Sequence, residues 1–145
     1  MIGLLQRVTS ASVVVDGVQI AAISKGLLGL VAVHRDDEEK DIARLAERIL
    51  TYRVFPDAAD RMNYSVVDAC LGLLLVPQFT LAADTKKGTR ASFTRAAAPE
   101  VGEAYFERLV GICKQRLKTV ETGRFGANMQ IGLTNDGPVT FWLES

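Results

Sequence analysis

The sequence predicts an α+β fold: mostly antiparallel β-sheets that form a barrel-like core, with two main helices packed outside. Two observations carry this prediction. Strand-like apolar runs occur in hairpin arrangement rather than in regular alternation with helices, and only two segments show the 3.6-residue apolar spacing of an amphipathic helix. The chain has 145 residues, 48% of them hydrophobic, which can bury one good core but hardly two, so we expect a single domain over residues 1–145.

The first half of the chain predicts a hairpin, a third strand and a helix. The β-rich runs at residues 2–15 and 18–23 flank Asp16-Gly17, a strong two-residue turn signal, and a further apolar run covers residues 26–34. Residues 36–55 predict a helix, because acidic residues crowd its start, where the helix dipole favours them. Its apolar positions are Ile42, Leu45, Ala46, Ile49 and Leu50, and a loop at Pro56, Asp57 and Asp60 follows.

The second half predicts a buried strand, a helix and a closing pair of strands. Residues 70–83, "CLGLLLVPQFTLAA", form the buried strand, which Pro77 must interrupt or leave at an edge. Pro99-Glu100 can open the second helix, whose apolar positions include Val101, Tyr105, Leu109, Ile112 and Cys113. Residues 124–144 then predict two strands joined across a turn at Asn135-Asp136-Gly137-Pro138.

The net charge, the start of the chain and the cysteines limit the partners and the cellular location that we expect. Seventeen basic and seventeen acidic residues cancel, so a polyanionic partner must be met by a local patch. The start of the chain lacks the pattern of a signal peptide, and no apolar run approaches the roughly 20 residues of a membrane span. We therefore expect a cytoplasmic protein that does not enter the membrane. Cys70 and Cys113 are too few and too far apart for a disulfide framework, and both are expected to be reduced, buried thiols.

Several enzyme classes are excluded by missing motifs. The chain has no G-x-S-x-G nucleophile elbow, no H-E-x-x-H, no P-loop and no G-x-G-x-x-G, so no nucleotide cofactor and no metal are implied. The single histidine, His34, ends a predicted strand, and we expect a non-catalytic role for it rather than a catalytic one. The carboxylates at residues 36–41 are explained by a solvated helix start.

Two remaining segments combine proline with hydroxyl and amide side chains: "PQFTLAAD" (residues 77–84) and "NDGPVT" (residues 135–140). Together with "QRVTSASV" (6–13), "TGRFGANMQ" (122–130) and the terminal "FWL", these segments closely resemble the D-aminoacyl-tRNA deacylases. The resemblance runs end to end, in order and in length. The paired QFTL and NDGPVT motifs at this separation are quite specific.

The resemblance implies a proofreading hydrolase that cleaves the ester between a D-amino acid, or glycine mischarged on tRNA(Ala), and the terminal ribose of tRNA. It also implies a homodimer without metal or cofactor. Gly137-Pro138 would be a cis peptide that reaches from one subunit into the pocket of the other and turns its carbonyls towards the substrate's α-carbon. This main-chain filter would reject L-aminoacyl-tRNA, whereas the residues alone would predict only a turn with a trans bond.

Three residues of the QFTL motif are the candidate catalytic residues: Gln78, Phe79 and Thr80. Thr80 as a nucleophile would need an activating base, and neither histidine nor lysine accompanies it nearby in the sequence. The favoured alternative is that the main-chain amides of this segment stabilise the oxyanion while the substrate's own ribose hydroxyl assists. The family usually has Ser where this chain has Pro77, so a hydroxyl and an N–H are lost at that position.

The remaining candidates bind substrate. Arg7 is expected to anchor the Gly137-Pro138 segment through its carbonyls, although an exposed strand arginine is the plain alternative. Phe125 and Met129 could line the pocket for the aminoacyl or adenosine group, or could simply be core. Lys86, Lys87 and Arg90 are placed to meet phosphates near the tRNA acceptor end, or to form a solvated loop.

Two other functions remain open at this point. A non-catalytic tRNA-binding or editing-like module would share the fold, and its pocket would merely hold a ligand. A purely structural oligomer would explain the core pattern but would leave both proline-containing motifs without a purpose.

Overall fold

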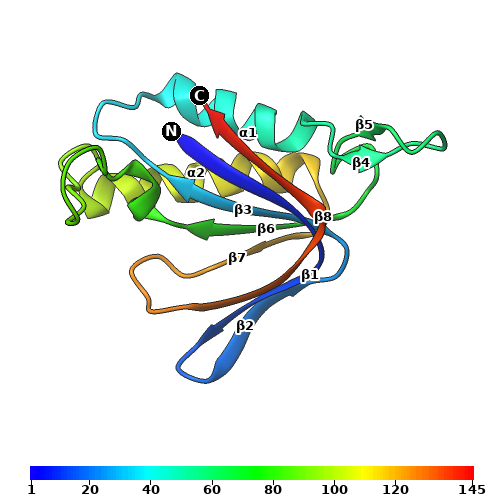
Figure 1. The fold of residues 1–145 in the computed structure, drawn as a ribbon, viewed down its shortest axis with the longest axis horizontal. Coiled ribbons are helices and arrows are strands. Elements are labelled where there is room, and N and C mark those ends of the chain that lie inside the picture. Colours follow the sequence, from blue (N-terminus) through cyan, green and yellow to red (C-terminus); the bar gives the residue numbers. More distant parts are fainter.

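The computed structural model describes residues 1–145 and contains two long helices and eight strands (Figure 1). In chain order, the elements are β1 (Ile2–Val15), β2 (Val18–Ile23), β3 (Gly26–Ala32), α1 (Glu39–Thr51), β4 (Phe55–Pro56), β5 (Met62–Tyr64), β6 (Gly72–Pro77), the 3₁₀-helix η1 (Phe79–Ala82), α2 (Pro99–Arg116), β7 (Val120–Thr122) and β8 (Gln130–Glu144). No helix has the length and apolar character needed to cross a bilayer.

Strand β1 organises the sheet. It pairs antiparallel with β2, β3 and β8, whereas the β3–β6 and β6–β7 pairs are parallel. The strand order is β2-β1-β3-β6-β7, with β8 on β1 as well, and β2 also lies against β6 and β7. The sheet therefore curls into a nearly closed barrel, and α1 and α2 lie together outside it (Figure 1). This arrangement confirms the predicted α+β class.

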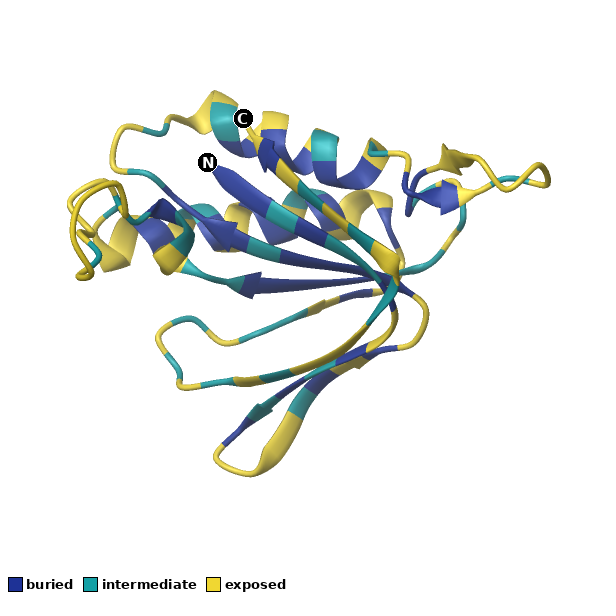
Figure 2. Cartoon of the chain, viewed as in Figure 1, coloured by how far each residue is buried: buried dark blue, intermediate teal, exposed yellow.

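Alternation along the strands supplies two cores. In β6, Leu73 and Leu75 belong to the core between sheet and helices, whereas Leu74 and Val76 belong to the core inside the barrel. Successive side chains of a strand point to opposite faces, so a strand covered on both faces is apolar throughout. Figure 2 shows the buried residues concentrated along β3, β6 and the first part of β1, and many exposed residues along β8.

The predicted buried face of the first helix is confirmed: Ile42, Leu45, Ala46, Ile49 and Leu50 are all buried in α1. For α2, the prediction is partly wrong. Leu109 and Cys113 are buried and Tyr105 and Ile112 are half-buried, but Val101 is 43% exposed. The helix instead turns Phe106 and Val110 towards the core, which shifts its apolar stripe away from Val101.

The predicted turn between two closing strands is wrong. β8 is one strand of 15 residues that pairs with β1 at both of its ends, from Gln130 opposite Val14 to Glu144 opposite Ile2, with a break at residues 136–139. The Asn135–Pro138 segment lies inside this strand, where the register shifts. Val8 pairs with Asn135 and Gln6 pairs with Thr140, so the single residue Arg7 of β1 lies opposite residues 136–139 of β8. The segment is therefore a bulge, which bends a strand without reversing it.

Three further expectations are corrected. Residues 70–83 are not one strand, because β6 ends at Pro77 and η1 follows. The loop after α1 contains a short antiparallel pair, β4 with β5, and β7 was not predicted at all. Cys70 is exposed rather than buried, at a positive φ of 51° in the turn before β6, while Cys113 is buried as predicted.

The Asp16-Gly17 turn is confirmed, since Val15 pairs with Val18 across it.

Candidate active site

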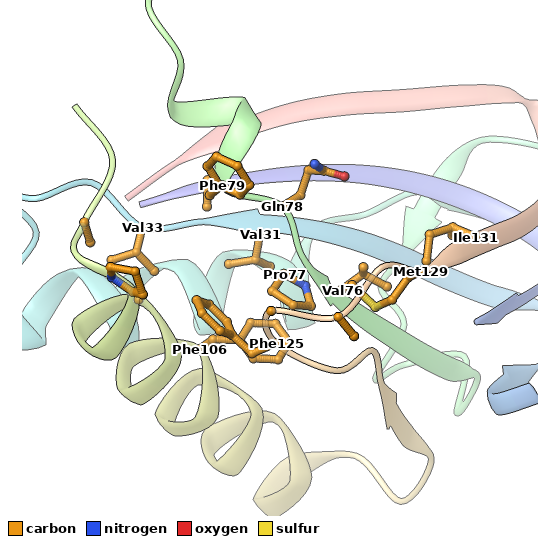
Figure 3. Close-up of a pocket in the computed structure, with 16 residues that line it drawn as sticks. Val31, Val33, Val76, Pro77, Gln78, Phe79, Phe106, Phe125, Met129 and Ile131 are labelled. Atoms are coloured by element: carbon orange, nitrogen blue, oxygen red, sulfur yellow. The ribbon is translucent and has the colours of Figure 1, made fainter. Parts of the chain in front are cut away.

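A cavity of about 450 Å³ opens where β3 and β6 end beside the start of α2 (Figure 3). Eleven of its sixteen lining residues are hydrophobic, so it favours an apolar group. Figure 3 shows Phe79 on one side of the cavity and Phe106 and Phe125 on the other. The helix can approach this closely because residue 102 is glycine: a Cβ there would lie 3.3 Å from Cζ of Phe125.

The QFTL motif forms one rim of the cavity. The N–H of Gln78 donates to the carbonyl of Val31 at 2.7 Å, which joins the rim to β3. Of the three amides expected to serve the substrate, the amide of Gln78 is therefore already bonded. The N–H groups of Phe79 and Thr80 begin η1, and the first N–H groups of a helix have no acceptor within it. Of these two residues, Phe79 lines the cavity and Thr80 does not.

The Thr80 hydroxyl has a side-chain partner and lies outside the cavity lining. It accepts a hydrogen bond from Nε2 of Gln78 at 2.5 Å, and Thr80 is not among the lining residues. His34 is also absent from the lining; it forms a bridge with Ala96, and partial burial lowers its pKa from the ordinary value of 6.5. No group of three or more His, Cys, Asp or Glu side chains is placed to hold a metal ion.

Pro77 ends the pairing of β6 with β7. Along this pair, the N–H of Leu73 donates to the carbonyl of Thr119, and the N–H of Gly123 donates to the carbonyl of Leu75 at 2.8 Å. If the pairing continued, the next bond would run from the N–H of residue 77 to the carbonyl of Gly123. Proline has no N–H, and β7 stops at Thr122. The chain then leaves the sheet and lines the cavity with Pro77 itself.

Arg7 and the Gly137-Pro138 segment form a second group. Nε of Arg7 donates to the main-chain carbonyl of Asp136 at 3.0 Å, and Nη1 donates to the carbonyl of Val54 at 2.7 Å. The N–H of Val139 donates to Oδ1 of Asn135 at 2.8 Å, across the Gly137-Pro138 bond, which is cis. Gly137 has a φ of 140°, and both it and Pro138 are exposed.

Within one chain these two groups lie apart. Arg7 pairs with Leu27 in β3, whereas the cavity begins at Val31, four residues further along that strand. At about 3.3 Å per residue, the separation along the sheet is about 13 Å. Arg7 also bonds to Val54, next to the β4–β5 pair at the opposite end of the molecule from the loop after η1 (Figure 1).

The structure brings together four predicted site residues, Gln78, Phe79, Phe125 and Met129, around the cavity. The predicted cationic residues Lys86, Lys87 and Arg90 are exposed on the loop after η1. Two aromatic neighbours of the site were not predicted: Phe106, which lines the cavity, and Phe93, which contacts Phe79. If the buried face of the second helix had been placed along Gly102 and Phe106, which lie one turn apart, the sequence would have predicted that Phe106 is buried. Phe93 lies in a polar segment whose pattern predicts no contact.

Two solved structures share this fold. A solved structure described as a probable eukaryotic D-amino acid tRNA deacylase has a TM-score of 0.87 over 99% of this chain and 98% of its own. It is 17% identical, so the likeness is one of fold. A solved structure of a c-Myc DNA unwinding element binding protein has a TM-score of 0.95 and 37% identity, covering 100% of this chain and 99% of its own.

Sequence relatives identify the family. The model of the D-Tyr-tRNA(Tyr) deacylase family matches residues 4–144. This chain is 63% identical to the D-aminoacyl-tRNA deacylase of Alkalilimnicola ehrlichii over 100% of its length and 97% of the relative's. It is 53% identical to that of Vibrio cholerae serotype O1 over the whole of both chains. The chain belongs to the D-Tyr-tRNA(Tyr) deacylase family, whose members are hydrolases of ester bonds.

Proposed function

We propose that this chain hydrolyses the ester between a D-amino acid, or the glycine mischarged on tRNA(Ala), and the terminal ribose of tRNA. In this proposal the cavity receives the aminoacyl end, and Gly137-Pro138 of a partner subunit rejects L-amino acids. The observation that carries it is the anchoring of Gly137-Pro138: Arg7 and Asn135 hold an exposed stretch of main chain on both sides. Residues 1–145 act as a single deacylase domain.

A main-chain filter suits this task because rejection of one enantiomer needs an obstacle on one side of a single carbon atom. A side chain could rotate away from the substrate. The carbonyls around Pro138 cannot, because its ring restricts φ and the Arg7 and Asn135 bonds hold the flanking residues. An L-side chain would therefore meet a persistent clash. Glycine has no Cβ and would pass the filter.

Two features support a homodimer. Arg7, which anchors Gly137-Pro138, pairs with β3 about 13 Å along the strand from the cavity residue Val31, so one copy would complete the site of the other rather than its own. In addition, β8 pairs with β1 only, and its face carries Leu133 at 39% and Trp142 at 49% exposure. Such apolar exposure along an unpaired edge is typical of a surface that associates.

For the chemistry, we assign the N–H groups of Phe79 and Thr80 to the ester carbonyl oxygen. Water adds to the carbonyl carbon, and negative charge develops on the carbonyl oxygen. The bond between the carbonyl carbon and the ribose oxygen then breaks, and the ribose oxygen takes up a proton. The neighbouring ribose hydroxyl of the substrate assists by positioning the water. Lys86, Lys87 and Arg90 would meet phosphates of the acceptor end.

The decisive experiment compares release of tyrosine from D-tyrosyl-tRNA and L-tyrosyl-tRNA, with glycyl-tRNA as a third substrate. We expect rapid release from the D-substrate and the glycyl substrate, and none above background from the L-substrate. No release from any would favour a non-catalytic tRNA-binding module. Rapid release from both enantiomers would remove the filter assigned to Gly137-Pro138.

A second experiment separates the hydroxyl of Thr80 from its amide. Thr80→Val removes the hydroxyl and retains the main-chain N–H and nearly the same shape. If the amide is the working group, the D-substrate is hydrolysed within a few-fold of the normal rate. If the rate of hydrolysis falls by about a thousandfold or more, as expected when a nucleophile is removed, the Thr80 hydroxyl takes part in the reaction.

A further inference from the structure

Phe79 and Phe93 form an exposed aromatic pair beside the cavity. Their ring centroids are 5.1 Å apart with an interplanar angle of 55°, and the residues are 56% and 44% exposed. The chain has six phenylalanines, and only these two are exposed. Core packing therefore does not account for the pair, and about half of its surface is open to a ligand.

The segment that carries Phe93 is held by main-chain hydrogen bonds on both sides. Ser92 exchanges two bonds with Asp84, at 2.8 and 3.0 Å. Beyond Phe93, the N–H of Ala97 donates to the carbonyl of Val33 at 3.0 Å, and the N–H of Arg35 donates to the carbonyl of Arg95 at 3.0 Å. Phe93 is thus presented at a defined place beside the rim residue Phe79.

The same segment concentrates positive charge. Residues 84–95 contain four basic residues and one acidic residue, a net charge of +3 in a chain whose total is zero. Arg35 also lies against this segment: its Nη1 donates to the carbonyl of Thr94 at 3.3 Å, while its Nε is paired with Oδ1 of Asp36 at 3.5 Å. Exposed aromatic rings among cationic side chains are the combination by which proteins hold single-stranded nucleic acid: rings stack on bases and cations meet phosphates.

We propose that Phe93, together with Phe79, stacks on the base of the nucleotide that precedes the terminal adenosine of tRNA. The inference rests on the proposed function, in which the cavity holds the aminoacyl end. A cavity of about 450 Å³ is the size of a site for one small ligand, so the preceding nucleotide must lie outside, at the rim where Phe79 stands. The cations of residues 84–95 are then next to its phosphate.

The test uses two substrates that differ by this nucleotide: the D-tyrosyl ester of adenosine and that of cytidylyl-adenosine. For the unaltered protein, we expect a higher kcat/KM on the dinucleotide ester. In Phe93→Ala, kcat/KM on the dinucleotide should fall by about 5- to 150-fold, the loss of one stacked base, while the adenosine ester changes by less than about twofold. Phe93→Tyr should restore the preference, and Val18→Ala, at another exposed apolar residue, should leave it unchanged.

Three results would overturn the inference. These are the absence of any dinucleotide preference in the unaltered protein, an equal loss on both esters in Phe93→Ala, and dissociation of an oligomer by Phe93→Ala in sedimentation. The last would assign the ring pair to a contact between copies of this chain.

Equilibrium binding of uncharged cytidylyl-adenosine needs no hydrolysis, so it separates failure of the inference from failure of the proposed function. If the protein hydrolyses neither ester, the proposed function fails. The stacking site then still stands if Phe93→Ala weakens binding of the dinucleotide and falls if that binding is unchanged.

Discussion

Arg7 donates a hydrogen bond from Nε to the main-chain carbonyl of Asp136 at 3.0 Å, one residue before Gly137. The same guanidinium group bonds to the carbonyl of Val54, and the Arg7 side chain is only 13% exposed. A strand near the N-terminus therefore anchors a bulge near the C-terminus and the segment after α1 at a single point.

Replacing Arg7 with lysine should weaken both the fold and the filter. Lysine presents a single ammonium group in place of a fork of donors, so one of the two carbonyls loses its partner. We expect the free energy of unfolding to fall by about 1–3 kcal/mol in urea denaturation. The ratio of D-tyrosyl to L-tyrosyl hydrolysis should fall as well. Arg44→Lys, on the exposed face of α1, is the matched control, and an unchanged ratio would limit Arg7 to a structural role.

Gly137→Ala should be destabilising. A Cβ at this residue would lie 2.6 Å from Cγ2 of Val139 and 3.2 Å from Nη2 of Arg7, and the φ of 140° is one that only glycine adopts readily. We expect a loss of about 1–3 kcal/mol in thermal or urea unfolding. Gly111→Ala provides the opposite control: its Cβ meets nothing, so alanine in this helix should stabilise by about 0.5–1 kcal/mol. Equal effects at both positions would contradict the structure.

The two cysteines should differ sharply in reactivity. Burial raises the pKa of the Cys113 thiol to about 12, so almost no thiolate forms at pH 8, whereas Cys70 is exposed. An aromatic disulfide reagent should label one thiol rapidly in the folded protein and the second only after unfolding. Cys70→Ser should abolish the rapid phase. Persistence of that phase would mean that Cys113 is accessible.

The cationic loop should set the salt dependence of tRNA binding. Replacing Lys86, Lys87 and Arg90 with alanine removes three exposed cations, each expected to release counterions from the RNA. The slope of log affinity against log salt should decrease by about 0.7 for each single-strand phosphate that the variant no longer neutralises. Chirality preference should not change, because these residues are outside the cavity lining. Lys25→Ala, in the β2–β3 turn, should leave the slope as it is; an unaltered slope in the triple variant would discard the assignment.

Asp68 should contribute to stability in a pH-dependent way. Its carboxylate accepts hydrogen bonds from the hydroxyl of Ser65 at 2.6 Å and from the N–H of Ser65 at 2.9 Å, and these bonds lower its pKa from the ordinary value of 3.8. The folded protein therefore binds this proton less readily than the unfolded chain. The contribution is complete above 3.8 and is lost as the pH falls through the lowered pKa.

Asp68→Asn should accordingly reduce stability at neutral pH and flatten the decline in stability as the pH falls below about 5, as measured by urea midpoints. Asp16→Asn, in the exposed β1–β2 turn, serves as the control, because asparagine also suits the positive φ of 50° at that position. An Asp68→Asn variant with the original pH profile would contradict the assignment.

Local spacing determined a large part of this fold. The buried face of α1 follows from its helical periodicity, and the Asp16-Gly17 hairpin follows from residues that tolerate positive φ. β6 could be identified as buried because it is apolar on both faces. The QFTL and NDGPVT motifs, together with three further short segments, also indicated the family, since each is a contiguous stretch of sequence.

Other features depend on partners that are distant in the chain. The Asn135–Pro138 segment has the composition of a turn, yet it lies inside one strand because β1 pairs with β8 on both sides of it. Pro77 ends β6 at the place where Gly123 would need a donor. Phe93, in a polar loop, meets Phe79 only because Asp84 and Val33 hold that loop in place.

The sequence by itself thus determined the elements whose residues satisfy one another within a few positions: the buried face of α1, the tight turn between β1 and β2, and the apolar strand β6. The tertiary structure decided which strand continues through a proline, how the cavity is assembled and how far it lies from Gly137-Pro138. The physical reason is that main-chain hydrogen bonds and side-chain contacts between remote segments outweigh local conformational preference, and a single stretch of sequence contains only one side of such a contact.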